Sequence, residues 1–189
     1  SRDNVDRSRF VYVGGSQGGA FGFYLLGLNR NFSRAKVYIA AMCDLMAVHH
    51  GQHEIWPSIF DRHDPKDWPK IKTIAPYFDA ANFAHRIDCP VKFEAGLADM
   101  VCPATQIAAA YNRIPVEDKE IHFEPGMGHS CTKLFYRDWN QWLYQPYVRG
   151  RRTAANSEEV MVGGLAEAVY GDETIKTICA EKLGDMTTL

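Results

Sequence analysis

Short apolar runs alternate along this chain with segments whose apolar residues recur at helical spacing. Residues 10–13 (FVYV) form one such run, glycines follow, and residues 17–30 (QGGAFGFYLLGLNR) have apolar positions on more than one side of a helix. A short apolar run that ends in glycines is typical of a buried strand. The pattern therefore predicts a strand, a sharp turn and a helix over residues 10–30.

The same alternation continues toward the carboxyl terminus. Further buried strands are predicted at 36–42 (KVYIAAM), 91–97 (VKFEAGL) and 119–125 (KEIHFEP), with helices at 103–114 and within 132–147. Strands that alternate with helices are typical of a parallel sheet with helices packed on it. We therefore expect an α/β fold with helices on both faces of a mostly parallel sheet.

Two segments depart from this rhythm. Residues 44–88 are rich in His, Asp, Pro and Trp, which favours an insertion of short helices and loops beside the sheet. Residues 150–189 follow the last helix that the core needs. We therefore expect one α/β domain over 1–149, which contains the insertion, and a tail or helical extension over 150–189 without an assigned role.

Composition limits the classes of partner. The chain has 189 residues, 46% of them hydrophobic, and a formal net charge of -2, as in an ordinary globular domain. Neither a basic patch for nucleic acid nor an apolar run of about 20 residues for a membrane is present in the sequence. The five cysteines are odd in number and form no C-x-x-C pair, so neither a disulfide framework nor a zinc site is expected.

Ser16 is the first candidate for chemistry. Residues 14–18 (GGSQG) match G-x-S-x-G between a predicted strand and a predicted helix, which is the setting of a nucleophile elbow. There the backbone N–H of Gln17, at the start of the helix, would face a developing oxyanion. A glycine-rich phosphate loop or a structural turn is the alternative, although the G-K-[ST] ending of a P-loop is absent.

An acid and a histidine follow Ser16 in the order that such an elbow requires. Asp99 comes shortly after the predicted strand 91–97, and His129 comes after the strand 119–125 in the loop GMGHS. The carboxyl ends of parallel strands share one edge of the sheet, so all three side chains are expected to meet there. Asp79 is the rival for the acid role, but it precedes its strand.

A group of histidines and acids in the insertion offers a second interpretation, as metal ligands. Their spacing matches no strong metal motif, so hydrogen-bonded or solvated loop residues are favoured and no metal is expected. The residues are His49, His50, His53, His63, Asp44, Glu54, Asp61 and Asp64.

Several segments together resemble one known family. GGSQGG around Ser16, residues 77–91 (YFDAANFAHRIDCPV), residues 96–114 (GLADMVCPATQIAAAYNRI) and the later His129 resemble the acetyl xylan esterase and cephalosporin C deacetylase family, carbohydrate esterase family 7. This family belongs to the α/β-hydrolase superfamily. The resemblance spans roughly residues 5 to 146.

The resemblance implies a function and its residues. Ser16, His129 and Asp99 would form the catalytic triad of an esterase that removes acetyl groups from xylose units and similar small compounds, without a cofactor and often as a hexamer. One position differs, because family members usually carry a glutamate after the histidine and this chain has Ser130.

The resemblance also implies a missing part. Only nine residues precede Phe10, whereas an α/β-hydrolase has about half its sheet before the elbow, together with the loop that gives a second oxyanion donor. We therefore expect the carboxyl-terminal part of the fold, completed by the rest of a longer protein or by a companion chain.

Three functions are weighed on these grounds. The first is a serine esterase that acts on acetylated sugars through an acyl-enzyme. The second is another α/β-hydrolase, such as a prolyl-oligopeptidase-like peptidase or a lipase, since one fold hosts many substrates. The third is a non-catalytic remnant of a hydrolase that acts as a subunit or interaction module.

Overall fold

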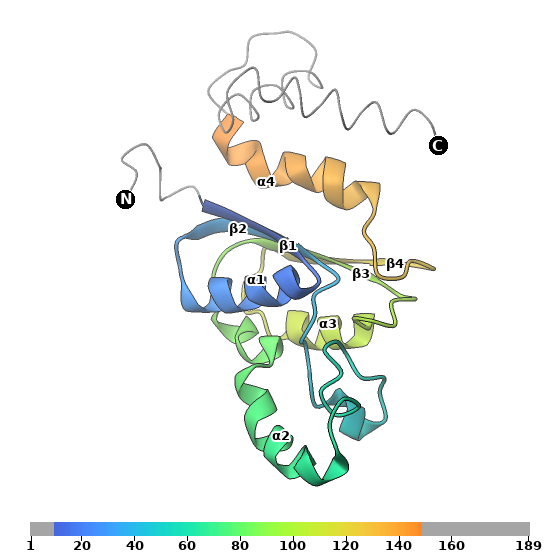
Figure 1. Ribbon diagram of the computed structural model, residues 1–189. Helices are drawn as coiled ribbons and strands as arrows, with labels where there is room; N and C mark the ends of the chain where they lie inside the picture. Colours follow the sequence, from blue (N-terminus) through green and yellow to red (C-terminus); the bar gives the residue numbers. More distant parts are fainter. Residues whose placement is uncertain (1–9, 149–189) are drawn as a thin grey trace, which may run out of the picture. The chain divides into compact units, whose positions relative to one another are not determined.

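Four parallel strands form the sheet at the centre of the protein (Figure 1). The computed structural model describes residues 10–148, so the predicted tail over 150–189 lies outside the described residues. The strands lie side by side in chain order, with bounds β1 (Phe10–Gly15), β2 (Phe32–Tyr38), β3 (Val91–Gly96) and β4 (Lys119–Glu124). The predicted α/β fold with a parallel sheet is confirmed.

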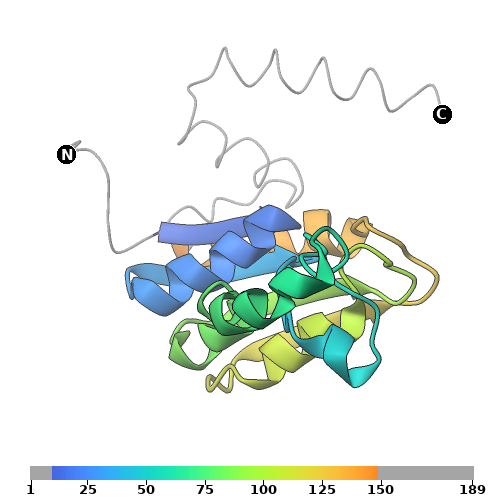
Figure 2. The ribbon, with the colours of Figure 1, turned by 60° about the horizontal axis from the view of Figure 1, so that its bottom comes forward.

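Helices cover both faces of the sheet (Figure 1). One face carries α1 (Gln17–Leu28) and α3 (Ala104–Asn112), and the opposite face carries α4 (Trp139–Val148), which continues from the π-helical turn Leu134–Asp138. Figure 2 shows α1 and α3 in front of the sheet and α4 behind it. No helix within residues 10–148 is both long enough and apolar enough to cross a bilayer.

The insertion at 44–88 consists of short helices joined by loops, as the composition predicts. It leaves the sheet after β2 and returns to it at β3, on the side of the sheet where α1 and α3 lie (Figure 2). Its elements are the 3-10 helices Ala47–His50, Pro65–Asp67, Ala75–Tyr77, Ala80–Asn82 and Ala84–Arg86, and the α-helix α2 (Trp68–Ile74).

The second strand differs from its predicted position. β2 covers Phe32–Tyr38, whereas the apolar run predicts 36–42. Ile39 and Met42 have positive φ angles of 41° and 57°, which extended strands do not contain. The chain therefore leaves the sheet at Tyr38, and the apolar residues that follow line the edge where the site forms.

The hydrophobic core lies on both faces of the sheet. Between the sheet and α1, the rings of Phe23 and Phe93 stack with their centroids 5.1 Å apart, and both side chains are fully buried. On the opposite face, Phe135 of the π-helical turn and Trp139 and Leu143 of α4 are buried. Burial of side chains on both faces fixes the strands and, with them, the loops at the carboxyl edge of the sheet.

Candidate active site

Ser16 occupies a strained turn between β1 and α1. Its φ and ψ angles are 53° and -123°, and a positive φ at a residue other than glycine is energetically unfavourable. The turn is held by its backbone, because Ser16 N–H donates to the Tyr38 carbonyl at 3.1 Å and Ala41 N–H donates to the Ser16 carbonyl at 2.9 Å. The elbow is therefore fixed by β2 and the residues that follow it.

The turn requires glycine at both positions before Ser16: at Gly14 of the motif, where a Cβ would lie 2.6 Å from the Gly18 carbonyl oxygen, and at Gly15. A Cβ at Gly15 would lie 2.1 Å from the Tyr38 ring, so no larger residue fits without displacing that ring. Gly18, the last glycine of G-x-S-x-G, has no atom within 4 Å of the position a Cβ would take. The turn thus depends on the two glycines before Ser16, whereas packing does not require a glycine at position 18.

Asp99 lies in the loop that follows β3, and its side chain is fully buried. Its Oδ1 accepts hydrogen bonds from the backbone N–H groups of Val101 at 2.8 Å and Cys102 at 2.9 Å. These bonds satisfy one carboxylate oxygen within the loop. The other oxygen, Oδ2, faces His129.

His129 joins the other two residues. Its Nδ1 lies 2.8 Å from Asp99 Oδ2, and its Nε2 lies 2.9 Å from Ser16 Oγ. When Nδ1–H donates to the carboxylate, Nε2 has a free lone pair that accepts the serine hydroxyl proton. The imidazole is 28% exposed, so a ligand from solvent can reach it. The structure therefore brings together the three residues that the sequence singles out.

Gly96 allows the loops of Asp99 and His129 to meet. A Cβ at Gly96 would lie 2.3 Å from the Met127 carbonyl oxygen and 2.6 Å from that of Gly128. The Ala98 N–H also donates to the Met127 carbonyl at 3.0 Å. The loop that carries His129 thus packs directly on the end of β3, and only glycine leaves room for it.

The Gln17 backbone N–H is available to a ligand. Gln17 is the first residue of α1, so its N–H has no acceptor within the helix. None of the residues that the structure describes accepts a hydrogen bond from it. An N–H at a helix amino terminus favours negative charge, so this group can donate to an oxyanion beside Ser16.

Cys102 is a neighbour of the site that the sequence analysis missed. Its thiol is buried, and the Ser16 side chain lies near enough to influence the pKa of the thiol. Burial, reinforced by the nearby Asp99 charge, raises the pKa of this thiol to about 12. It therefore stays protonated at neutral pH and does not compete with Ser16 as a nucleophile. Its place three residues after Asp99 was the signal available in the sequence.

Asp79, the rival acid, has another role. Its carboxylate accepts hydrogen bonds from the backbone N–H groups of Asp44 at 2.9 Å, Leu45 at 2.7 Å and Ala81 at 2.9 Å. The side chain is buried, which raises its pKa, while these three bonds oppose that rise. Asp79 therefore ties two parts of the insertion together.

Three of the histidines and acids of the insertion form hydrogen bonds with the backbone around them. His53 Nε2 lies 2.9 Å from the Met100 carbonyl, His63 Nδ1 lies 2.7 Å from the Ile59 carbonyl, and Glu54 accepts from the Phe60 N–H at 2.7 Å. Within residues 10–148, no group of three or more His, Cys, Asp or Glu side chains is arranged to hold a metal ion. These residues serve the local structure of the loops.

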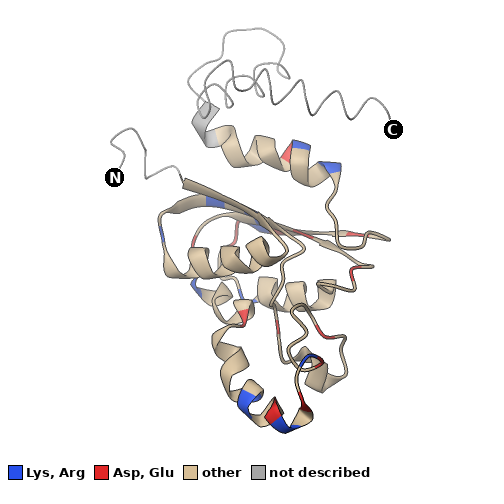
Figure 3. Ribbon diagram, in the orientation of Figure 1, with Lys and Arg blue, Asp and Glu red and all other residues tan. Residues whose placement is uncertain are grey.

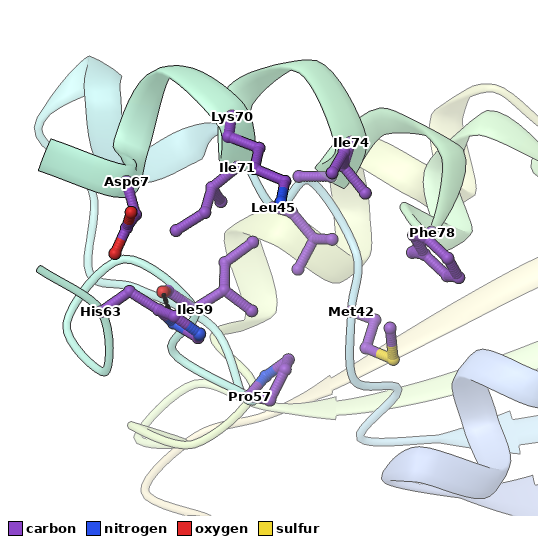
Figure 4. Close-up of a pocket in the computed structure, with 11 residues that line it drawn as sticks. Met42, Leu45, Pro57, Ile59, His63, Asp67, Lys70, Ile71, Ile74 and Phe78 are labelled. Atoms are coloured by element: carbon purple, nitrogen blue, oxygen red, sulfur yellow. Dashed lines mark hydrogen bonds between the residues drawn. The ribbon is translucent and has the colours of Figure 1, made fainter. Parts of the chain in front are cut away.

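A mainly apolar cavity of about 540 Å³ lies between α2 and the loops of the insertion (Figure 4). Met42 and Pro57 form part of its wall, and Met42 directly follows Ala41, which donates to the Ser16 carbonyl. Asp67 and Lys70 line it from the α2 side. None of the three residues that meet at the elbow lines this cavity, so it adjoins the site as a separate recess.

Comparison with known proteins relates the chain to esterases. The sequence model of the acetyl xylan esterase (AXE1) family matches residues 1–145. The acetyl esterase Axe7A of Xylanibacter ruminicola is 35% identical over 135 residues, which cover 70% of this chain and 30% of that protein.

Two solved structures of acetyl xylan esterases are also similar. The Paenibacillus sp. R4 protein has a TM-score of 0.68 and 26% identity, with 76% of this chain and 47% of that chain covered. The Thermoanaerobacterium sp. acetyl xylan esterase 1 has a TM-score of 0.67 and 27% identity, with 77% of this chain and 48% of that chain covered. The chain thus matches about half the length of these structures, and less of the curated relative.

Proposed function

Because the chain belongs to the acetyl xylan esterase family, we propose that it supplies the catalytic serine, histidine and aspartate of a serine esterase. Its substrates would be acetylated sugars or similar small acetate esters, the class of ester that its relatives are named for. The observation that carries the proposal is the chain of hydrogen bonds from Asp99 through His129 to Ser16. This arrangement activates a serine hydroxyl for attack on an ester.

In the first half of the reaction, Ser16 Oγ attacks the acetyl carbonyl carbon while His129 Nε2 takes the hydroxyl proton. The Gln17 N–H stabilises the negative charge that develops on the carbonyl oxygen, and Asp99 stabilises the imidazolium. The intermediate collapses when the bond from the acetyl carbon to the sugar oxygen breaks. His129 gives its proton to that oxygen, so a free sugar hydroxyl leaves and Ser16 is acetylated.

In the second half, a water molecule replaces the sugar. His129 takes a proton from the water, whose oxygen attacks the acetyl carbon, and the bond from that carbon to Ser16 Oγ breaks. The proton passes to Ser16, and acetate is released. Protons move only between Ser16, His129, the substrate and water, so the cycle consumes no cofactor.

The edge of the sheet next to Ser16 supports a further part of the proposal. β1 pairs only with β2 among the described strands, and Figure 3 shows no charged residue on α1. Phe10 and Val13 on β1, with Phe21, Leu25 and Leu28 on α1, are between 37% and 60% exposed. We propose that further strands cover this apolar edge, from the rest of a longer chain, a companion chain or another copy.

The strands proposed to cover the β1 edge would also complete the oxyanion site. The chain offers the Gln17 N–H as one donor, and a second donor in this fold comes from a loop after an earlier strand. Loss of one donor costs about 100-fold to 1000-fold in rate. We therefore expect full activity only when the covering part is present.

Turnover of p-nitrophenyl acetate and acetylated xylose by the full-length protein tests the proposal. Ser16→Ala should abolish turnover of both esters. Ser58→Ala is the matched control, because Ser58 also has a positive φ, of 55°, but lies in the insertion. Unchanged turnover in Ser16→Ala would refute the proposal, and an equal loss in Ser58→Ala would mean that backbone strain rather than the hydroxyl explains the effect.

A further inference from the structure

Glu94 is a buried acid that neither the elbow nor the reaction uses. It lies in β3, five residues before Asp99, and is fully buried. Its Oε1 accepts a hydrogen bond from the Thr132 backbone N–H at 3.0 Å, while Oε2 has no hydrogen-bond partner among the described residues. Burial of a carboxylate is unfavourable unless its hydrogen bonds compensate for the lost water. The role of Glu94 in the fold therefore depends on its hydrogen bond with the Thr132 N–H.

That bond fixes the chain on the far side of His129. Before His129, the Met127 carbonyl accepts the Ala98 N–H at 3.0 Å. After His129, Thr132 N–H donates to Glu94. One bond comes from Ala98, in the loop after β3, and the other from Glu94, in β3 itself. The chain is therefore bonded to the segment 94–98 both before and after His129.

A second buried group holds the next part of the same segment. Lys36 Nζ donates to the Phe135 carbonyl at 2.9 Å and to Asn140 Oδ1. Burial lowers the pKa of Lys36 to about 8, while Cys131 and Glu94 nearby oppose this fall. The segment after His129 is thus attached to β3 through Glu94 and to β2 through Lys36. Of these two contacts, the one from Glu94 lies nearer to the imidazole in the chain.

We propose that Glu94 is a positioning residue for His129: its carboxylate holds Thr132 so that the imidazole lies between Asp99 and Ser16. The inference rests on the proposed function, since it concerns the base of that reaction. Among the described residues, the Glu94 carboxylate forms a hydrogen bond with neither Ser16 nor the imidazole, so it acts through the backbone of residues 130–132. Small displacements of a reacting group have large effects on rate, on the order of 100-fold for about 1 Å.

Three variants separate this role from general stability. Glu94→Leu fills a similar volume without an acceptor, and Glu94→Gln keeps an amide oxygen that can accept the Thr132 N–H. Glu54→Leu is the matched control, because Glu54 is also a buried carboxylate that accepts backbone N–H groups, from Phe60 and Asp61, but lies in the insertion.

The first readout needs no turnover. The 15N shifts of the His129 ring, at a pH where it is neutral, report which nitrogen carries the proton. We expect the Nδ1–H tautomer in the unchanged chain, in Glu94→Gln and in Glu54→Leu, and a mixture of tautomers in Glu94→Leu. A single Nδ1–H tautomer in folded Glu94→Leu would overturn the proposal.

Amide hydrogen exchange tests the contact without any variant. The Thr132 amide should exchange much more slowly than the Lys133 amide, which has no hydrogen-bond acceptor among the described residues. Equal rates would mean that Glu94 does not hold this segment in solution, and the proposal would fail even if Glu94→Leu did not fold.

Kinetics of the full-length protein give the third readout. Glu94→Leu should lower kcat about 10-fold to 100-fold with KM unchanged, whereas Glu94→Gln and Glu54→Leu should keep kcat within about twofold. If Ser16→Ala is as active as the unchanged protein, the proposed function fails. If Ser16→Ala is inactive but Glu94→Leu keeps full kcat, only the positioning role of Glu94 fails.

Discussion

Gly19 in α1 provides a sharp test of how the helix that follows Ser16 packs on the sheet. A Cβ at Gly19 would lie 2.7 Å from Ala40 Cα and 2.9 Å from Ala40 Cβ, which is too close for non-bonded carbon atoms. The nearest atom belongs to the backbone, so the clash cannot be relieved by a rotamer change. Gly19→Ala must therefore move α1 away from the residues after β2.

Gly18→Ala supplies the matched control. Gly18 lies one residue earlier in the same helical turn and has no atom within 4 Å of the Cβ position. Replacement of glycine by alanine in a helix stabilises it by up to about 1 kcal/mol, and this gain applies to both variants. Overpacking costs about 1–3 kcal/mol. Gly19→Ala should therefore be less stable than Gly18→Ala by about 1–3 kcal/mol.

Urea unfolding, followed by tryptophan fluorescence, measures this difference directly. The slope of the free energy of unfolding against urea should be the same for both variants, because a change in slope would indicate a change in compactness. The reasoning is refuted if the two variants have equal free energies of unfolding, since the close approach of Gly19 to Ala40 would then carry no cost.

Three further substitutions test other contacts. Burial lowers the pKa of Lys36 from 10.5 to about 8, so the unfolded chain binds this proton more tightly and the folded state gains stability as pH rises through that window. A pKa shift is equivalent to 1.36 kcal/mol per pH unit, so between pH 8 and 10.5 the free energy of unfolding of the unchanged protein should rise by about 3 kcal/mol relative to that of Lys36→Met. If the difference between the two proteins does not change with pH, Lys36 is not buried as the structure indicates. Asp79→Ala leaves three backbone N–H groups without their acceptor and should lower the free energy of unfolding by about 3 kcal/mol in urea; a loss below about 1 kcal/mol would count against this role. Gly96→Ala forces a Cβ against the Met127 carbonyl and should lower kcat about 100-fold by displacing His129, whereas unchanged kcat would show that the loop tolerates the shift.

The arrangement of the sheet and of the three site residues was largely predictable from the sequence. The apolar runs fix three of the strands to within a few residues, and a parallel sheet places the loops after β1, β3 and β4 at one edge. Ser16, Asp99 and His129 follow those strands in chain order. Once the strands are correctly predicted, the parallel sheet places the three residues near one another. Their catalytic role stays a prediction for experiment.

The local geometry around the site was not predictable in the same way. The end of β2 depends on the positive φ of Ile39, which an apolar run does not reveal. The contact of Cys102 with Ser16 depends on how the acid loop folds back after β3. The role of Glu94 had one signal in the sequence, an acidic residue inside a strand that is predicted to be buried, but its partner Thr132 is distant in the chain and becomes visible only in the structure.

Covalent labelling of the full-length protein by a fluorophosphonate, with the modified peptide identified by mass spectrometry, tests the central claim most directly. The probe reacts with a serine only when a base activates its hydroxyl. The account predicts a single adduct on Ser16 that is absent from Ser16→Ala and greatly slowed in His129→Ala. An unlabelled protein, or an adduct on a different serine, would contradict it.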